Sequence, residues 1–349
     1  MTRVGVLGGG QLAKMLALAG APLDIRLTVV EPAPHPPAAT VAQVVAAPYD
    51  SAEARHALAS CDVVTVELEN VPVEVLVWLA ERVPVHPSPD AVAAAQDRRA
   101  EKLALRAAGA VTAPIDHEAG LPAIVKARYG GYDGRAQRRV ETPAELAAAL
   151  AVLPAPIVEG VVEFGRELSV IGVRGHDGVT AIYPLIENVH CDGLLHSSRA
   201  PAIVSAHARQ EATRLVHALT TRFDYVGVLA VELFDTGEGL VANEMAPRVH
   251  NSGHWTIEGA VTSQFEQHLR AICGLPLGET AVRGVAAMIN LIGRVPHLAA
   301  LLAVPGAHVH IYGKQPRAGR KLGHVTVVAD DADTLDGRLL TVERLVAEA

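Results

Sequence analysis

Residues 226–259 read VGVLAVELFDTGEGLVANEMAPRVHNSGHWTIEG, and they say more about the fold than any other stretch of the chain. Apolar and polar residues alternate on both sides of a turn at residues 235–239, which is typical of a β-hairpin. The turn lies near the midpoint between Glu232 and Glu244, so the two carboxylates are expected to be close to cross-strand partners. A pair of hard oxygen ligands that leaves room for phosphates is typical of a Mg²⁺ site. Two glutamates on a solvated face are the plainer alternative.

The composition excludes several classes of protein. The chain has 349 residues, 50% of them hydrophobic, and a formal net charge of −8. That length predicts two or three domains, and the charge argues against nucleic-acid or membrane-surface partners. Cys61, Cys191 and Cys273 lack CxxC spacing, so we expect neither disulfides nor a zinc site, which fits the cytoplasm. We also expect no signal peptide and no transmembrane helix.

Strand and helix patterns alternate in the first hundred residues. Residues 3–7, 27–30 and 61–66 have the pattern of buried strands, and residues 11–19 and 73–82 that of helices. This alternation predicts an α/β fold with a doubly wound parallel sheet. We expect three domains: residues 1–95 around this sheet, residues 96–178 with a connector helix and a small α+β lid, and residues 179–349 with the carboxylate hairpin.

A glycine-rich turn, GGGQLA at residues 8–13, directly follows the first strand and matches G-x-G-x-x-A. Alone, it indicates dinucleotide binding with Glu31 on the ribose hydroxyls, as in a nicotinamide-dependent oxidoreductase. Two alternatives stay open at this point. The turn either tolerates glycine with no further role, or its helix N-terminus binds another phosphate.

Two lysines lie where a nucleotide could bind. Lys102 is on the connector helix, and Lys126 ends an apolar strand just before the glycine-rich residues 130–134. An ammonium group suits phosphate oxygens, and a glycine loop can offer backbone N–H groups to them. A plain hairpin turn is the alternative. Residues 157–169 form an apolar linker that contains glutamates. The apolar linker suits an adenine, and a downstream glutamate suits the hydroxyls of a ribose.

In this order, the segments resemble the ATP-grasp superfamily and, within it, the N5-carboxyaminoimidazole ribonucleotide synthases. The resemblance runs from residue 5 to about residue 326. It is carried by GGGQLAKM, QDRRAEKLAL, VKARYGGYDGRAQ, RELSVI, YPLIEN, YVGVLAVELF, NEMAPRVHNSGHWTIEGAVTSQFEQHLRAI, MINLIG and YGKQPRAGRKLGHVT. It implies an ATP-grasp fold behind a pre-ATP-grasp domain, and a homodimer. It also implies carboxylation of 5-aminoimidazole ribonucleotide with ATP, Mg²⁺ and bicarbonate, through carboxyphosphate.

The resemblance implies a role for each residue of the site. ATP would be bound by Lys102, Lys126, Gly130, Gly131, Glu159, Val162, Glu167 and Asn243, and Mg²⁺ by Glu232 and Glu244. The ribonucleotide would be bound by Gly10, Gln11, Leu12, Tyr132, Ser252, Lys314, Arg320 and Lys321. The imidazole and the bicarbonate would be surrounded by Asp133, Arg135, Arg248, His250 and Asn251.

The sequence departs from the family pattern in two segments. Arg135 and Ala136 stand where the family's GYDGKGQ has lysine and glycine, and alanine is expected to restrict φ and stiffen the lid. The hinge at residues 159–162 reads EGVV instead of EEFV, so an aromatic contact is lost. The rivals are another ATP-grasp ligase, such as the formate-dependent glycinamide ribonucleotide transformylase, the oxidoreductase, and a silent binding protein.

Overall fold

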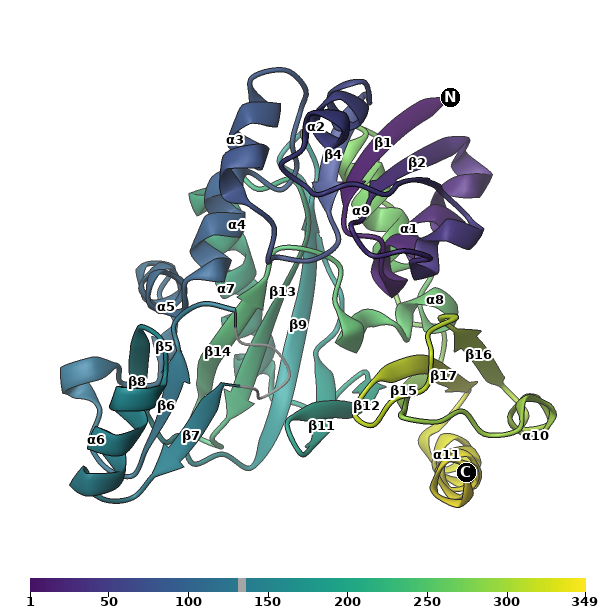
Figure 1. Cartoon of the computed structure of the whole chain (residues 1–349). Coiled ribbons are helices and arrows are strands. Elements are labelled where there is room, and N and C mark those ends of the chain that lie inside the picture. Colours follow the sequence, from purple (N-terminus) through teal and green to yellow (C-terminus); the bar gives the residue numbers. More distant parts are fainter. Residues whose placement is uncertain (131–135) are drawn as a thin grey trace.

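Three β-sheets organise residues 1–130 and 136–349, the part of the chain that the computed structural model describes. A four-stranded sheet is formed by the N-terminal region, a three-stranded sheet forms a small lid, and a ten-stranded sheet runs between them to the C-terminal region (Figure 1). The expected α/β fold with an N-terminal parallel sheet is therefore confirmed. None of the described helices is long and apolar enough to cross a bilayer.

The N-terminal sheet has the strand order β3-β2-β1-β4, and every pairing in it is parallel. Residues 4–7 of its interior strand β1 are buried and apolar, as expected when helices cover both faces of a sheet. The strands are β1 (Thr2–Leu7), β2 (Ile25–Val30), β3 (Gln43–Val45) and β4 (Val63–Val66), and the helices are α1 (Gln11–Gly20), α2 (Ala52–Ala59), α3 (Val73–Ala80) and α4 (Pro89–Gln96).

The connector helix α5 (Arg98–Ala107) leads to the lid. The lid sheet, β7-β6-β8, is antiparallel and consists of β6 (Ala123–Ala127), β7 (Gln137–Val140) and β8 (Pro156–Gly160), with α6 (Pro143–Val152) against it. Asp97 caps α5 by accepting from the backbone of Arg99 and Ala100, and it also binds the guanidinium of Arg128 at 2.6 and 2.7 Å. One carboxylate thus ties the start of α5 to the end of the lid strand β6.

The large sheet has the order β16-β17-β15-β12-β11-β9-β13-β14-β5, with β10 paired to β9. Its strands are β5 (Val111–Thr112), β9 (Arg166–Arg174), β10 (Thr180–Ile182), β11 (Ile186–Cys191), β12 (Leu194–Ala200), β13 (Gly227–Asp235), β14 (Leu240–Ala246), β15 (Val285–Ile292), β16 (Ala307–Ile311) and β17 (Lys321–Ala329). Because β9 already belongs to this sheet, the lid sheet ends at β8. The division of the chain at residues 95 and 178 stays a prediction.

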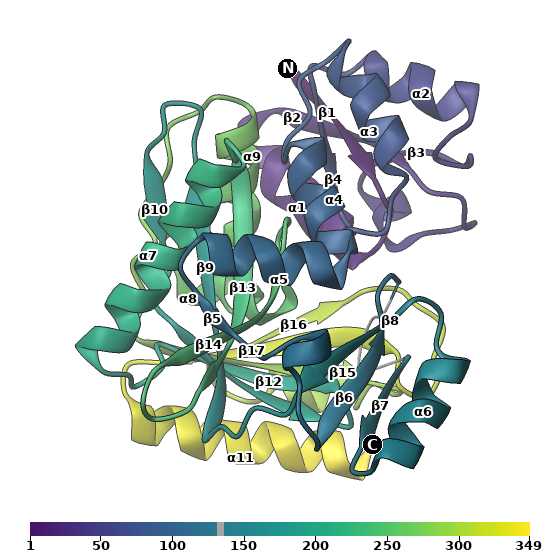
Figure 2. The ribbon, with the colours of Figure 1, turned by 90° about the vertical axis from the view of Figure 1, so that its left-hand side faces the viewer.

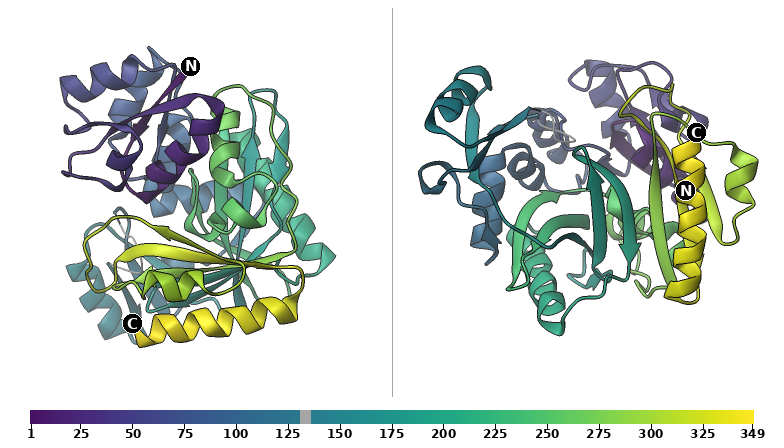
Figure 3. Two further views of the ribbon diagram at one scale, coloured as in Figure 1. Left: turned by 90° about the vertical axis from the view of Figure 1, so that its right-hand side faces the viewer. Right: turned by 90° about the horizontal axis from the view of Figure 1, so that it is seen from below.

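Helices cover the large sheet on both sides. They are α7 (Ala206–Arg222), α8 (Thr256–Gly259), α9 (Gln264–Ile272), α10 (Leu298–Leu302) and α11 (Ala332–Glu348). Helix α7 packs on β9 and β13, whereas α11 runs along the C-terminal strands β15 and β17 (Figures 2 and 3). Helix α9 packs against α1, and Leu16 shares a buried apolar cluster with Phe265 and Leu269. The N-terminal region and the large sheet therefore share one core.

A buried histidine reinforces that junction. The Nδ1 atom of His268 on α9 accepts from the backbone N–H of Val228 at 3.1 Å, and its Nε2 lies 2.8 Å from the hydroxyl of Thr65 on β4. Since a backbone N–H only donates, the ring proton belongs on Nε2. Burial lowers the pKa of His268 to about 3, so the ring stays neutral in this position.

Candidate active site

The predicted hairpin is formed by β13 and β14, and Glu232 lies directly opposite Glu244 across the antiparallel pair, as the spacing indicated. A register shift follows, because Leu233 pairs with Ala242 and leaves Asn243 as the extra residue of a β-bulge. Ala242 is buried, whereas Asn243 and Glu244 are both part-exposed. The bulge therefore turns two successive polar side chains toward the face that carries Glu232.

These side chains line a cleft of about 710 Å³ between the three sheets. The predicted residues in its wall are Gly10, Gln11, Leu12, Lys126, Gly130, Glu167, Glu232, Asn243, Glu244, Arg248, His250, Asn251, Lys314 and Lys321. The structure thus brings together residues that are more than 300 positions apart in the sequence. Gly131, Tyr132, Asp133 and Arg135 lie outside the described residues.

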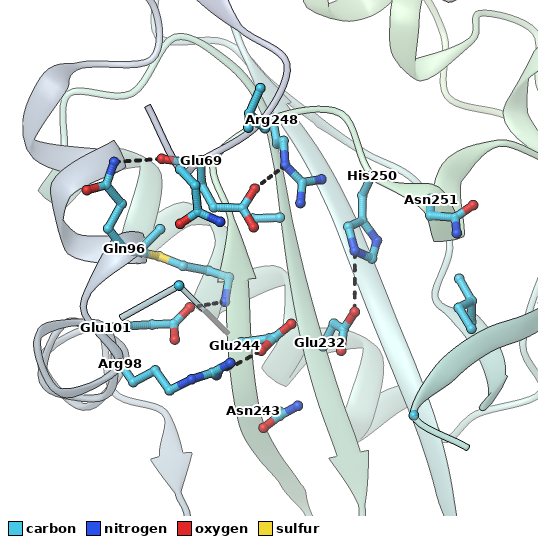
Figure 4. Close-up of a pocket in the computed structure, with 18 of the residues that line it drawn as sticks. Glu69, Gln96, Arg98, Glu101, Glu232, Asn243, Glu244, Arg248, His250 and Asn251 are labelled. Atoms are coloured by element: carbon cyan, nitrogen blue, oxygen red, sulfur yellow. Dashed lines mark hydrogen bonds and ion pairs between the residues drawn. The ribbon is translucent and has the colours of Figure 1, made fainter. Parts of the chain in front are cut away.

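Each carboxylate of the hairpin pair has a cationic or hydrogen-bonding partner (Figure 4). Glu232 Oε1 lies 3.3 Å from His250 Nε2, and Glu244 Oε2 lies 3.3 Å from Arg98 Nη1. Burial would raise the pKa of Glu232, but the hydrogen bond with His250 and nearby positive charges lower it to about 2. The carboxylate is therefore ionised at neutral pH.

The donor set fits Mg²⁺ better than a softer metal. It consists of two carboxylates, Glu232 and Glu244, with the amide of Asn243 beside them on the bulge. Within residues 1–130 and 136–349, no three His, Cys, Asp or Glu side chains gather closely enough to hold a metal by themselves. Mg²⁺ commonly binds through one or two carboxylates together with substrate phosphates, and this site offers that arrangement.

Behind this wall, Glu159 binds two lysines through one oxygen. Lys126 Nζ lies 2.7 Å from Glu159 Oε2, and Lys102 Nζ lies 3.4 Å from the same atom. Lys102, which is 2% exposed, also donates to the backbone oxygen of Asn243 at 2.5 Å. Burial opposes ionisation, but the two ammonium groups hold the pKa of Glu159 below its usual value. Lys126 reaches the cleft, whereas Lys102 and Glu159 support it from behind, and Val162 is half-buried in the hinge.

The glycine turn holds a carboxylate of the protein itself. Glu67 Oε2 accepts from Gly10 N at 2.9 Å, and Oε1 accepts from Leu12 N at 3.1 Å. A Cβ on Gly10 would come within 2.2 Å of Glu67 Oε1, which explains the glycine. Glu31 accepts from Gly9 N at 3.0 Å. The place where a dinucleotide would bind its pyrophosphate is thus already taken by Glu67, which disfavours the oxidoreductase interpretation.

The basic segment after β16 reaches this turn. Lys314 Nζ donates to Gln11 Oε1 at 2.5 Å, and Lys321, at 8% exposed, also lines the cleft. Arg320 differs from them, because it donates to Gln315 O at 3.2 Å and is not part of the cleft wall. The segment therefore places two lysines in the cleft wall, one of them in contact with Gln11 at the glycine turn.

The segment after β14 supplies the remaining polar groups. Arg248 Nε donates to Glu69 Oε2 at 2.5 Å, which joins this segment to the N-terminal region (Figure 4). Asn251 lines the cleft, and both polar atoms of its amide are buried without a hydrogen-bond partner among the described residues. Ser252 is fully buried behind His250, with its Oγ 2.9 Å from the Nδ1 atom of that ring.

The cleft wall also contains residues that the sequence analysis did not single out, among them Arg98, His190 and Glu101. Arg98 lies four residues before Lys102 on α5, so a charge pattern at helical spacing was available as a signal. His190 contacts Glu167 through Nδ1; burial opposes protonation, but this contact raises the pKa of His190. Glu101 Oε1 accepts from Met245 N at 2.6 Å, and burial raises the pKa of Glu101 to about 8. No sequence signal distinguished His190 or Glu101.

Comparison with known families divides the chain into three matching segments. The ribonucleotide synthetase preATP-grasp domain matches residues 1–96. The ATP-grasp domain matches residues 96–265. The phosphoribosylaminoimidazole carboxylase C-terminal domain matches residues 286–338.

Full-length relatives are similar over nearly the whole chain. The N5-carboxyaminoimidazole ribonucleotide synthase of Pseudomonas aeruginosa is 46% identical and covers 99% of both chains. The Escherichia coli protein of the same name is 38% identical, covering 97% of this chain and 94% of its own. The crystal structure of the Thermus thermophilus synthetase superposes with a TM-score of 0.94, at 46% identity and 99% coverage of both chains. The Aspergillus clavatus synthase in complex with ADP and 5-aminoimidazole ribonucleotide gives 0.90, at 33% identity, covering 100% and 99%.

Proposed function

The chain belongs to the N5-carboxyaminoimidazole ribonucleotide synthase family, and we propose that its cleft carboxylates 5-aminoimidazole ribonucleotide with ATP and bicarbonate, as an ATP-dependent ligase of purine biosynthesis. The observation that carries this proposal is the meeting, in one cleft, of the Glu232–Glu244 pair, Lys126, and the Lys314–Gln11 contact. The glutamate pair and Lys126 suit a nucleoside triphosphate with its metal. The Lys314–Gln11 contact suits the phosphate of a second, smaller nucleotide.

In the first step, a bicarbonate oxygen attacks the γ-phosphorus of ATP. A new P–O bond forms, the bond to the β-phosphate oxygen breaks, and ADP leaves, so that carboxyphosphate is the intermediate. Lys126 and Arg98 lie in the cleft wall, where they can neutralise charge on the phosphoryl oxygens. When bound by Glu232 and Glu244 with Asn243 alongside, Mg²⁺ supplies further neutralisation of those oxygens.

In the second step, the exocyclic amine of the ribonucleotide attacks the carboxyl carbon. A C–N bond forms as the C–O bond to the phosphate breaks, and inorganic phosphate leaves with the proton that the amine loses. Arg248, His250 and Asn251 follow one another in the cleft wall and would orient the carboxyl group and the imidazole. The unpartnered amide of Asn251 supports this placement, because a buried amide needs a hydrogen-bonding partner and a substrate can provide it. No protein nucleophile is required, so catalysis depends on positioning.

Lys314 and Lys321 would bind the ribonucleotide phosphate, with Gly10, Gln11 and Leu12 at its border. Their support is the contact between Lys314 and Gln11 and the position of Lys321 in the cleft wall. Glu167, together with His190, would contact the ribose of ATP. The hinge at residues 159–162 would contact the adenine. We also propose a homodimer from the family resemblance, which light scattering after size-exclusion chromatography would test, and a cytoplasmic location from the three isolated cysteines.

Incubation with ¹³C-bicarbonate, Mg-ATP and 5-aminoimidazole ribonucleotide tests the proposal. We expect a carbamate carbon resonance that appears only when all three are present. A product formed instead from ¹³C-formate and glycinamide ribonucleotide would assign the cleft to the rival transformylase reaction. Incorporation of neither label, in protein that binds ATP, would contradict both assignments.

A further inference from the structure

A row of polar side chains crosses the large sheet on the face that carries the two glutamates. Along the adjacent strands β14, β13 and β9, Glu244 is paired with Glu232, and Glu232 with Ser169. On the next strands, β11 and β12, Asn188 is paired with Ser198. Ser169 pairs with Ile186, two residues from Asn188, so Ser169 and Asn188 are diagonal neighbours on the same face.

The inner part of this row forms a continuous chain of hydrogen bonds that ends on His250. Ser198 Oγ donates to Asn188 Oδ1 at 2.7 Å, and Asn188 Nδ2 donates to Ser169 Oγ at 3.0 Å. Ser169 Oγ is 2.8 Å from Ser252 Oγ, which is 2.9 Å from His250 Nδ1. Ser169, Ser198 and Ser252 are 0% exposed and Asn188 is 6% exposed. The reaction proposed above gives none of Ser169, Asn188 or Ser198 a contact with substrate.

The direction of the chain is fixed at both ends. The amide nitrogen of Asn188 only donates, so Ser169 Oγ accepts from it, which leaves the hydroxyl proton of Ser169 for the contact with Ser252 Oγ. Ser252 then donates its proton to His250 Nδ1. At the other end, the backbone N–H of Ser252 also donates to His250 Nδ1, at 3.3 Å. Two donors on Nδ1 leave the ring proton on Nε2, which faces Glu232 Oε1 at 3.3 Å (Figure 4).

We infer that Asn188 and Ser169 are positioning residues: through Ser252, they hold His250 as the Nε2–H tautomer directed at Glu232. Because Nε2 carries the proton and Nδ1 is occupied by Ser252, His250 acts in the cleft as a hydrogen-bond donor, not as a proton acceptor. The bond to Glu232 also fixes the side chain of one proposed metal ligand. The effect on turnover depends on the proposed function, whereas the tautomer itself does not.

The substitution Asn188→Asp tests the direction of the chain with little change of shape. It replaces the donor at the Asn188 end of the chain by a carboxylate, which only accepts when ionised, so Ser169 would donate to it and Ser252 would donate to Ser169. The lone pairs of the Ser252 hydroxyl would then face His250 Nδ1 and favour a proton there. Ser169→Ala interrupts the chain, and Ser169→Thr keeps a hydroxyl at the same place.

The tautomer is read from the ¹⁵N resonances of the histidine ring, with the signals of His250 identified by their loss in His250→Gln. We expect unmodified protein to show a protonated Nε2 and an unprotonated Nδ1. In Asn188→Asp, we expect the proton population on Nδ1 to rise. The matched control is Thr220→Val on α7, which removes a hydroxyl that is 1% exposed and donates only to its own helix, to His217 O.

Kinetics give the second readout. Changes to residues that orient a site side chain typically cost 10–100-fold, so we expect kcat to fall by about 10-fold in Asn188→Asp and Ser169→Ala. The KM for ATP should stay within about twofold, Ser169→Thr should recover most of kcat, and Thr220→Val should match unmodified protein.

Three results would overturn the inference. The first is a proton on Nδ1 of His250 in unmodified protein. The second is a loss of kcat in Asn188→Asp with no change in the ring resonances of His250, which would assign the hydrogen-bond chain a role in stability alone. The third is an unchanged kcat in Asn188→Asp although the tautomer of His250 changes. Absence of ribonucleotide-dependent turnover in unmodified protein would instead contradict the proposed function and would leave the resonances as the test of the tautomer.

Discussion

Glu232 and Glu244 face each other across the antiparallel strands β13 and β14, and each accepts from a different partner, His250 and Arg98. Two carboxylates in direct cross-strand positions repel each other. Here the repulsion is reduced from both sides, and the space before them is part of the cleft. This arrangement supports the proposal that the pair binds a cation together with anionic groups of a substrate.

Replacement of Glu244 by alanine should abolish turnover and leave the fold intact. The side chain is 42% exposed and is not part of an apolar cluster, so its removal takes away a proposed metal ligand without leaving a cavity. We expect a loss of at least about 100-fold in kcat, in line with losses at groups that stabilise developing charge. Mg-ATP binding is measured by calorimetry, and Glu238→Ala at the turn of the same hairpin is the control. Near-normal turnover in Glu244→Ala would rule out the metal assignment.

Glu159→Gln should destabilise the protein and make its stability depend more on ATP. The change leaves the ammonium groups of Lys102 and Lys126 without their shared carboxylate, and loss of one partner of a buried ion pair costs about 3–5 kcal/mol. Phosphates that bind Lys126 in the cleft wall would restore part of the compensation, so saturating ATP should raise the melting temperature of the variant more than that of unmodified protein. Glu163→Gln, on the exposed part of the same segment, is the control. Equal ATP-induced shifts would speak against contact between Lys126 and the phosphates.

Lys314→Met should weaken binding of the ribonucleotide and leave ATP binding unchanged. The ammonium lies at the glycine turn, 2.5 Å from Gln11 Oε1, and methionine removes its charge while keeping a long side chain. A hydrogen bond to a charged group contributes about 1.5–3 kcal/mol, which predicts a rise of about 10- to 100-fold in the KM for the ribonucleotide. Lys14→Met, whose ammonium donates to Ile311 O outside the cleft wall, is the control. A rise in the KM for ATP instead would move Lys314 to the other nucleotide.

Ala136→Gly should stabilise the protein. Ala136 has a φ of +56°, and the left-handed region costs a residue with a Cβ about 1–2 kcal/mol. The greater freedom of glycine in the unfolded chain offsets part of this relief, so we expect a gain of about 0.5–1 kcal/mol in the free energy of unfolding by urea. Ala147→Gly, in the middle of α6 of the same lid, should lose about 1 kcal/mol. Losses of similar size in both variants would show that Ala136 is not strained.

The hairpin and the parallel sheet could be predicted because each depends on local pattern. Alternation on both sides of the turn placed Glu232 opposite Glu244, and strand–helix alternation gave the sheet of β1 to β4. The bulge at Asn243 was not predicted, since one extra residue in a strand leaves the apolar pattern nearly unchanged. The limits of β9 were also not predicted, because an apolar segment does not indicate which sheet it joins.

Other features that the sequence did not predict depend on contacts between residues far apart in the chain. Glu67 is 57 residues from Gly10, and only the folded chain shows that its carboxylate fills the glycine turn. Ser252 was assigned to substrate by resemblance, yet the structure places it behind His250. Sequence motifs thus identified the residues of this region, whereas the direction of their hydrogen bonds required the coordinates.

The release of ADP by purified protein with Mg-ATP and bicarbonate, measured with and without 5-aminoimidazole ribonucleotide, tests the central claim most directly. We predict strong stimulation by the ribonucleotide, lost when bicarbonate is omitted. ADP release that does not respond to the ribonucleotide, or no release under any of these conditions, would contradict the proposed reaction.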